Sequence, residues 1–152
     1  MVILMIGDSM KRKLCLILLI ILSTFMFIGC SSNESKKLVE NEDYFIVGEF
    51  TGKYLDLTKR GYYIDTLDQM DAPYFYIICM GERSTGGYSL KIKEVNKVDD
   101  VTEIIVEEIE PKKGSVVTMA FTYPTIMIEF PEYQENIVIK NTKGEEFKYL
   151  GL

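Results

Sequence analysis

The chain contains no histidine, and this absence limits the chemistry that any site in it could perform. A Ser-His or Cys-His nucleophile pair is impossible, and so is a zinc or iron site built on imidazole ligands. Catalysis would have to rely on carboxylates, lysine or tyrosine, and the sequence does not group these into a set of acid, base and nucleophile. We therefore predict a non-catalytic protein without a cofactor.

Acidic residues cluster at two places, Asp99-Asp100 and the run of Glu107, Glu108 and Glu110. Carboxylates are the ligands that calcium prefers, but this spacing lacks the Asp-x-Asp-x-Asp-Gly pattern of a calcium-binding loop. We interpret both clusters as solvated strand edges and turns, and we predict no metal site in them.

The most distinctive stretch is 81–92, with Ser84-Thr85-Gly86-Gly87-Tyr88 at its centre. Glycine adopts positive φ without a steric penalty, so the backbone can turn sharply or approach another surface closely here. No Gly-Lys-Ser/Thr sequence follows, which excludes a phosphate-binding loop. Two interpretations remain open: a loop that contacts another protein, or a hairpin turn whose glycines serve only its dihedral angles.

The N-terminal segment 1–29 has the pattern of a secretory signal peptide. Lys11-Arg12-Lys13 forms the cationic region, and an apolar run over 14–28 follows it. That run is shorter than the ~20 residues of a membrane-spanning helix. Phe27-Ile28-Gly29-Cys30 resembles the lipobox of bacterial lipoproteins. The resemblance implies that Cys30 is acylated after cleavage and anchors the protein on the extracytoplasmic side of the cell membrane.

Residues 1–9 precede the cationic region, where a signal peptide would be expected to begin. Gly7-Asp8 can be encoded by a purine-rich ribosome-binding sequence just upstream of the Met10 codon. We hypothesise that Met10 is the initiator and that residues 1–9 are not translated. The nucleotide sequence tests this, because GGC-GAC codons for Gly7 and Asp8 would remove its support.

The remainder divides into a polar tether over 30–42 and one β domain over 43–152. The formal charge of the whole chain is −6, and removal of 1–29 takes away three cations and one acidic residue, leaving −8. An acidic body argues against nucleic acid as a partner and against electrostatic docking on anionic lipid. Cys79 is the one thiol left free once Cys15 is removed and Cys30 is acylated, and its apolar neighbours predict a buried structural role.

From Pro73 onward, apolar and alternating runs bounded by turn residues predict six to seven strands and no helix. The runs cover 74–80, 88–92, 101–109, 117–123, 126–130, 136–140 and 145–150. Residues 96–100 are predicted to form a polar turn. The alternation of apolar and polar residues is interrupted over 104–106, which indicates a β-bulge or a strand whose centre is covered on both faces. Segment 44–72 fits no template cleanly, although 44–47 is a candidate first strand. The pattern predicts an all-β antiparallel sandwich or barrel, with an immunoglobulin-like sandwich among the candidates.

Segment 74–130 resembles the PrcB C-terminal-domain family, which is named for a protease-complex subunit. The shared features are Gly81-Glu82, Thr85-Gly86-Gly87-Tyr88, a Glu-x-x-Pro-x-x-Gly run over 108–114 and Tyr123-Pro124 before the next apolar strand. The resemblance implies a non-catalytic, secreted lipoprotein that is a partner of secreted or surface proteases.

A second likeness is to chagasin-type inhibitors of cysteine proteases, whose Thr-Thr-Gly-Tyr/Phe loop is similar to 84–88 here. Their Arg-Pro-Trp element has no counterpart, because the chain has no tryptophan. The primary prediction is thus a membrane-anchored lipoprotein that binds or assists a secreted or surface protease or another envelope protein, and the alternative is a wedge-loop inhibitor. The predicted contact residues are Ser84, Thr85, Gly86, Gly87, Tyr88, Tyr123 and Pro124.

Overall fold

The computed structural model describes residues 35–52, 54–66 and 73–151. Every regular element within these ranges is a strand, which confirms the predicted all-β class. The strands are β1 (Ser35–Lys37), β2 (Phe45–Gly48), β3 (Arg60–Thr66), β4 (Tyr74–Met80), β5 (Ser89–Val98), β6 (Val101–Ile109), β7 (Thr125–Phe130) and β8 (Asn136–Asn141). The predicted signal peptide and Cys30 lie outside the described residues. Among the residues that are described, none belongs to a helix with the length and apolar character needed to cross a membrane.

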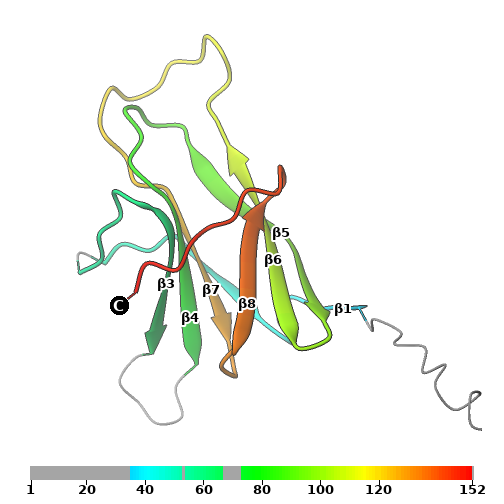
Figure 1. The fold of residues 1–152 in the computed structure, drawn as a ribbon. Coiled ribbons are helices and arrows are strands. Elements are labelled where there is room, and N and C mark those ends of the chain that lie inside the picture. Colours follow the sequence, from blue (N-terminus) through cyan, green and yellow to red (C-terminus); the bar gives the residue numbers. More distant parts are fainter. Residues whose placement is uncertain (1–34, 53, 67–72, 152) are drawn as a thin grey trace, which may run out of the picture. The chain divides into compact units, whose positions relative to one another are not determined.

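The strands form two four-stranded sheets, with the orders β1-β5-β6-β8 and β2-β7-β4-β3 (Figure 1). Apolar side chains from both sheets share one core, so the predicted sandwich is confirmed. One pair departs from the predicted antiparallel pattern, because β6 and β8 are parallel. The departure follows from the chain path: β7 crosses to the other sheet between them, so β8 returns beside β6 in the same direction.

Strand β4 is buried on both of its faces, which explains its uninterrupted apolar sequence. Tyr76 and Ile78 belong to the core between the sheets. Ile77 and Cys79 face outward. They are covered by the loop over 49–58, which includes Leu55, and by the C-terminal segment. Cys79 is fully buried, and burial raises the pKa of its thiol to about 12. It is thus a structural residue, as predicted.

The hairpin of β5 and β6 corrects two predicted details. Strand β5 continues to Val98, so the turn is confined to Asp99-Asp100 rather than spanning 96–100. The pairing register shifts at Lys93, opposite the centre of β6, so the bulge suggested by the phase slip lies on the neighbouring strand. Inward positions of β6 then include Glu108, while Ile109 is 37% exposed.

The N-terminal boundary of the sandwich differs from the predicted tether over 30–42. Ser35–Lys37 pair with the end of β5, Leu38 is buried, and the Leu38 amide donates a hydrogen bond of 2.8 Å to the Val95 carbonyl. The prediction is therefore wrong from Ser35 onward. Three exposed strand residues carry no hydrophobic periodicity, so no local pattern indicated this strand.

The C-terminal segment 145–150 is not the regular closing strand that the sequence predicted. The Phe147 amide donates to the Ile139 carbonyl of β8 at 2.8 Å. Three residues on, the Leu150 amide donates to the Tyr62 carbonyl of β3 at 2.9 Å. The segment thus bridges an edge of each sheet by isolated contacts instead of extending one sheet.

Candidate functional site

The glycine loop, residues 81–88, connects β4 to β5 at one end of the sandwich (Figure 1). Gly87 has φ of +87°, and a Cβ there would lie 2.9 Å from Pro111 Cβ and 3.1 Å from Val117 Cγ1. Gly86 lacks both restraints, since its φ is not positive and a Cβ would lie 3.5 Å from Thr118 Cβ. The two glycines of the motif therefore have different roles: Gly87 is required by the backbone and by packing, whereas Gly86 is not.

The connection between β6 and β7, residues 110–124, lies beside the glycine loop and is called the β6–β7 loop here. Its backbone accepts a hydrogen bond of 2.9 Å from the Gly86 amide at Thr118, and Arg83 and Thr122 exchange two further bonds of 2.9 Å. The Thr122 hydroxyl also donates to the Thr85 carbonyl at 2.8 Å. These bonds hold the two loops in one interlocked pair.

The strand predicted over 117–123 is wrong, because these residues belong to the β6–β7 loop. Only the isolated bridge between Arg83 and Thr122 joins them to another segment in a strand-like manner. The alternating sequence resembles a strand, but no neighbouring strand in the described residues offers it a continuous ladder. Alternation alone therefore misassigned the segment.

The structure brings the predicted contact residues of both loops to the same end of the domain. Tyr123 donates its hydroxyl to Glu82 Oε2 at 3.0 Å, and this hydrogen bond raises the pKa of the Tyr123 phenol. The Pro124 carbonyl accepts from the Met80 amide at 2.9 Å, next to the start of the glycine loop. The geometry thus unites 84–88 with 123–124, while their role in binding stays a prediction.

A third loop, residues 49–58, completes this end of the sandwich. The Glu82 amide donates to the Thr58 carbonyl at 3.1 Å, which joins this loop to the glycine loop. A cavity of about 300 Å³ separates Tyr123 from Leu55 and Leu57. Three loops therefore lie together at this end of the domain.

The most exposed apolar side chains of the described residues include those of the β6–β7 loop. Val116 is 102% exposed, Met119 84%, Phe121 65% and Tyr123 40%. We call these four residues the apolar tip. Sequence reasoning identified Tyr123 but missed the other three, because their alternation was taken as core packing. The flanking prolines, Pro111 and Pro124, were the available signal, since proline disrupts a strand ladder.

A polar network lies below the loops, centred on Glu108. Arg60 Nε donates to Glu108 Oε1 at 3.1 Å, and Asn141 Nδ2 donates to Glu108 Oε2 at 2.6 Å. The Arg60 guanidinium also lies 3.8 Å from the centre of the Phe147 ring. Burial alone would raise the pKa of Glu108, but the hydrogen bonds from Arg60 and Asn141 and the Arg60 charge outweigh it and lower the pKa. The network joins both sheets, and no sequence motif indicated it because its members are far apart in the chain.

A cavity of about 380 Å³ adjoins this network and the glycine loop. It is lined by Arg60, Met80, Arg83, Tyr88, Glu108, Glu110, Lys143 and Glu145. Three cations face three carboxylates, so the lining has no net charge. The described part of the chain contains no group of three or more acidic or cysteine residues placed to hold a metal ion. The arrangement is that of a structural ion-pair cluster.

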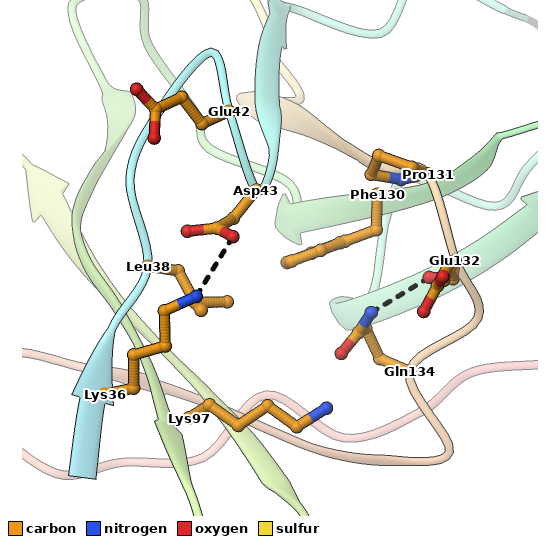
Figure 2. Close-up of a pocket in the computed structure, with 9 residues that line it drawn as sticks. All are labelled: Lys36, Leu38, Glu42, Asp43, Lys97, Phe130, Pro131, Glu132 and Gln134. Carbon is orange, nitrogen blue, oxygen red and sulfur yellow. Dashed lines mark hydrogen bonds and ion pairs between the residues drawn. The ribbon is translucent and has the colours of Figure 1, made fainter.

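Another cavity, of about 340 Å³, lies near the start of β1 and the β7–β8 connection. Figure 2 shows Lys36 paired with Asp43 and Lys97 close by, and it shows the Phe130 ring pointing into the cavity. The Lys36 Nζ and Asp43 Oδ1 atoms are 3.4 Å apart. Charges of both signs line this cavity too, and it lies away from every predicted contact residue.

Comparison with known protein families gives a match that covers the glycine loop and the β6–β7 loop. Residues 74–131 match the family model described as PrcB C-terminal. No curated protein and no solved structure matched the chain. The matched segment extends from β4 to the end of β7, so it contains both the glycine loop and the apolar tip. The resemblance predicted from Thr85-Gly86-Gly87-Tyr88 is confirmed, because residues 74–131 match the PrcB C-terminal family model.

Proposed function

We propose that the protein is a non-catalytic lipoprotein, anchored to the extracytoplasmic side of the cell membrane through Cys30. In this proposal it binds or assists a secreted or surface protease, or another envelope protein, through the loop end of the sandwich. The observation that carries the proposal is the exposure of Val116, Met119 and Phe121 on a loop held in place by hydrogen bonds. Contiguous exposed apolar patches mark protein interaction sites, and these side chains lie within six residues of one loop.

The family match supports the same conclusion, since the family is named for a subunit of a protease complex. The matched residues include the whole loop pair, so the family likeness and the exposed surface coincide. Gly87 and Thr122 keep the β6–β7 loop fixed relative to the sheets, which lowers the entropy lost when a partner binds.

A wedge-loop protease inhibitor is the second candidate. The observation in its favour is the grouping of three loops, 49–58, 81–88 and 110–124, at one end of the sandwich. Loops that are held together by hydrogen bonds at one end of a sandwich are suited to insertion into an enzyme cleft. The two candidates differ in one measurable outcome, because an inhibitor lowers the activity of the bound protease whereas an assisting subunit does not.

The test compares Gly86→Arg with Val39→Arg. Gly86 lies in the loop pair with room for a side chain, whereas Val39 is 48% exposed and lies outside the three loops. Each tagged variant is expressed with its signal peptide and purified from detergent-solubilised envelopes. We expect an envelope protein, identified by mass spectrometry, to co-purify with the wild type and Val39→Arg but not with Gly86→Arg.

Equal recovery by all three proteins would contradict a role for the glycine loop. Mass spectrometry of the mature N-terminus tests the anchor separately, and an unmodified Cys30 would contradict it. Addition of the purified protein to papain-like and subtilisin-like proteases tests the inhibitor alternative, and unchanged activity at micromolar concentration would exclude inhibition of those enzymes.

A further inference from the structure

The apolar tip and the point where the chain enters the sandwich lie at opposite ends of β5. Ser89, which follows the glycine loop, begins this strand, and Ser35 pairs with Val98 at its other end. Ten strand residues at a rise of about 3.3 Å span roughly 30 Å. The first described residue is therefore remote from the tip along the long axis of the sheet.

The chain between Cys30 and Ser35 is short. Five residue steps extend at most about 18 Å, which is less than the length of β5. A lipid on Cys30 therefore holds the β1 end of the domain close to the bilayer surface. This connection is shorter than the predicted tether over 30–42, because Ser35–Lys37 already pair with β5.

The outer face of the β1-β5-β6-β8 sheet would meet the bilayer if the domain lay on its side. Ion pairs cover this face, including Lys93 with Glu107 at 3.3 Å and Lys140 with Glu103. Charged groups lose favourable hydration when they enter an apolar environment, so this face remains in water. The short connection and the charged face together direct the apolar tip away from the membrane that carries the anchor.

We propose that the apolar tip docks into an apolar cleft, bordered by acidic groups, on a partner protein located on the side of the domain away from its own bilayer. The inference rests on the proposed function, since it takes Cys30 as the anchor. Lys112 and Lys113 supply the charge argument: both are exposed next to the tip, and neither forms an ion pair within the described residues. Two lysines near Val116, in a chain of net charge −6, favour acidic groups on the part of the partner that faces them.

The orientation is tested with a single dye on the lipid-anchored protein. Cysteine is introduced as Phe121→Cys at the tip or as Asp100→Cys in the β5–β6 turn, and an environment-sensitive dye is attached; the buried Cys79 stays unlabelled. The protein is reconstituted in vesicles of phosphatidylethanolamine and phosphatidylglycerol that contain an acceptor lipid. We expect strong energy transfer from position 100 and weak transfer from position 121. Blue-shifted, strongly quenched emission from position 121 would show the tip in the bilayer and would overturn the proposal.

The partner is tested by cross-linking in intact cells. A photoreactive benzoylphenylalanine replaces Phe121 or, as the control, Val39. We expect position 121 alone to form a cross-link, mapped by mass spectrometry to one apolar cleft with an acidic rim on one protein. Phe121→Ser should weaken binding of that identified protein at least about tenfold, and Val39→Ser should leave it unchanged. Cross-links shared by both positions, or unchanged affinity of Phe121→Ser, would overturn the docking proposal.

The proposed function and this inference fail in different ways. An unmodified Cys30 removes the anchor and hence the argument on orientation, whereas the cross-linking result still decides whether a protein occupies the tip. An anchored protein whose tip lies in the bilayer overturns the inference but leaves the lipoprotein proposal in place.

Discussion

The two glycines of the Thr85-Gly86-Gly87-Tyr88 motif should respond differently to replacement by alanine. Gly87→Ala should destabilise the fold, whereas Gly86→Ala should not. At Gly87 the backbone has φ of +87°, and the new Cβ would lie 2.9 Å from Pro111 Cβ. At Gly86 the Cβ would meet Thr118 Cβ at 3.5 Å, an ordinary contact distance. The two variants add the same methyl group to adjacent residues, so each is the control for the other.

The magnitude follows from these two environments. A non-glycine residue in the left-handed region costs about 1–2 kcal/mol, and the overlap of Gly87→Ala with Pro111 adds to this because the neighbouring loop must shift. We expect Gly87→Ala to lower the free energy of unfolding by about 2–3 kcal/mol. Gly86→Ala should leave it unchanged or raise it by up to about 1 kcal/mol, because alanine restricts the unfolded chain.

Urea denaturation followed by circular dichroism measures both values. The midpoint should fall for Gly87→Ala at an unchanged slope, which reports a change in stability alone. Thermal unfolding should show a loss of about 4 °C for each kcal/mol in a domain of this size. Equal destabilisation by both substitutions would refute the assignment of distinct roles to the two glycines.

Three further predictions concern the rest of the domain. The pKa of Glu108 is lowered in the folded state, so the contribution of its pair with Arg60 is present above the unfolded pKa near 4.5 and is lost as pH falls through the folded value; acid titrations should show a shallower loss of stability for Glu108→Gln. Cys79, with its pKa raised to about 12, should not react with a thiol reagent at neutral pH until the protein unfolds. Ile104→Ala should cost about 2–5 kcal/mol and Ile109→Ala about 1 kcal/mol in urea titrations, because Ile104 is fully buried and Ile109 is 37% exposed.

Each of these has a clear contrary result. Parallel acid-unfolding curves for the wild type and Glu108→Gln would show that the ion pair does not contribute to the pH dependence. Rapid modification of Cys79 in the native protein would contradict its burial. Similar losses at positions 104 and 109 would contradict the phase of β6.

The sequence predicted those strands whose own side chains carry a strong pattern. Strand β4 was assigned over 74–80 because it is buried on both faces, and β7 and β8 were assigned within one residue at their ends. Their apolar periodicity is a local property, so it is visible without knowledge of neighbouring strands. The predicted runs 136–140 and 145–150 are joined by a turn in which the Gly144 amide donates to the Asn141 carbonyl at 2.9 Å.

Features that depend on distant pairing were not predictable. Strand β1 has three exposed residues and exists because β5 provides an edge for it. The pair of Arg60 and Glu108 joins positions from different sheets, and Glu108 faces inward because it continues the phase of Ile104 and Val106 in β6. The bulge at Lys93 instead changes the phase of β5, so that Leu90 and Ile92 before it and Val95 after it all face the core.

The misassigned segment 117–123 is the most informative error for function. Its alternation is as regular as that of β7, yet β7 is buried and the apolar tip is exposed to water. Packing within this domain therefore does not account for Met119 and Phe121, although large apolar side chains in water favour aggregation. Local sequence rules fail most often where a residue serves binding rather than folding. The bonds from Arg83 and Gly86 hold this segment in its exposed position, which a flexible linker would not require, and the contradiction is resolved if a partner covers the tip.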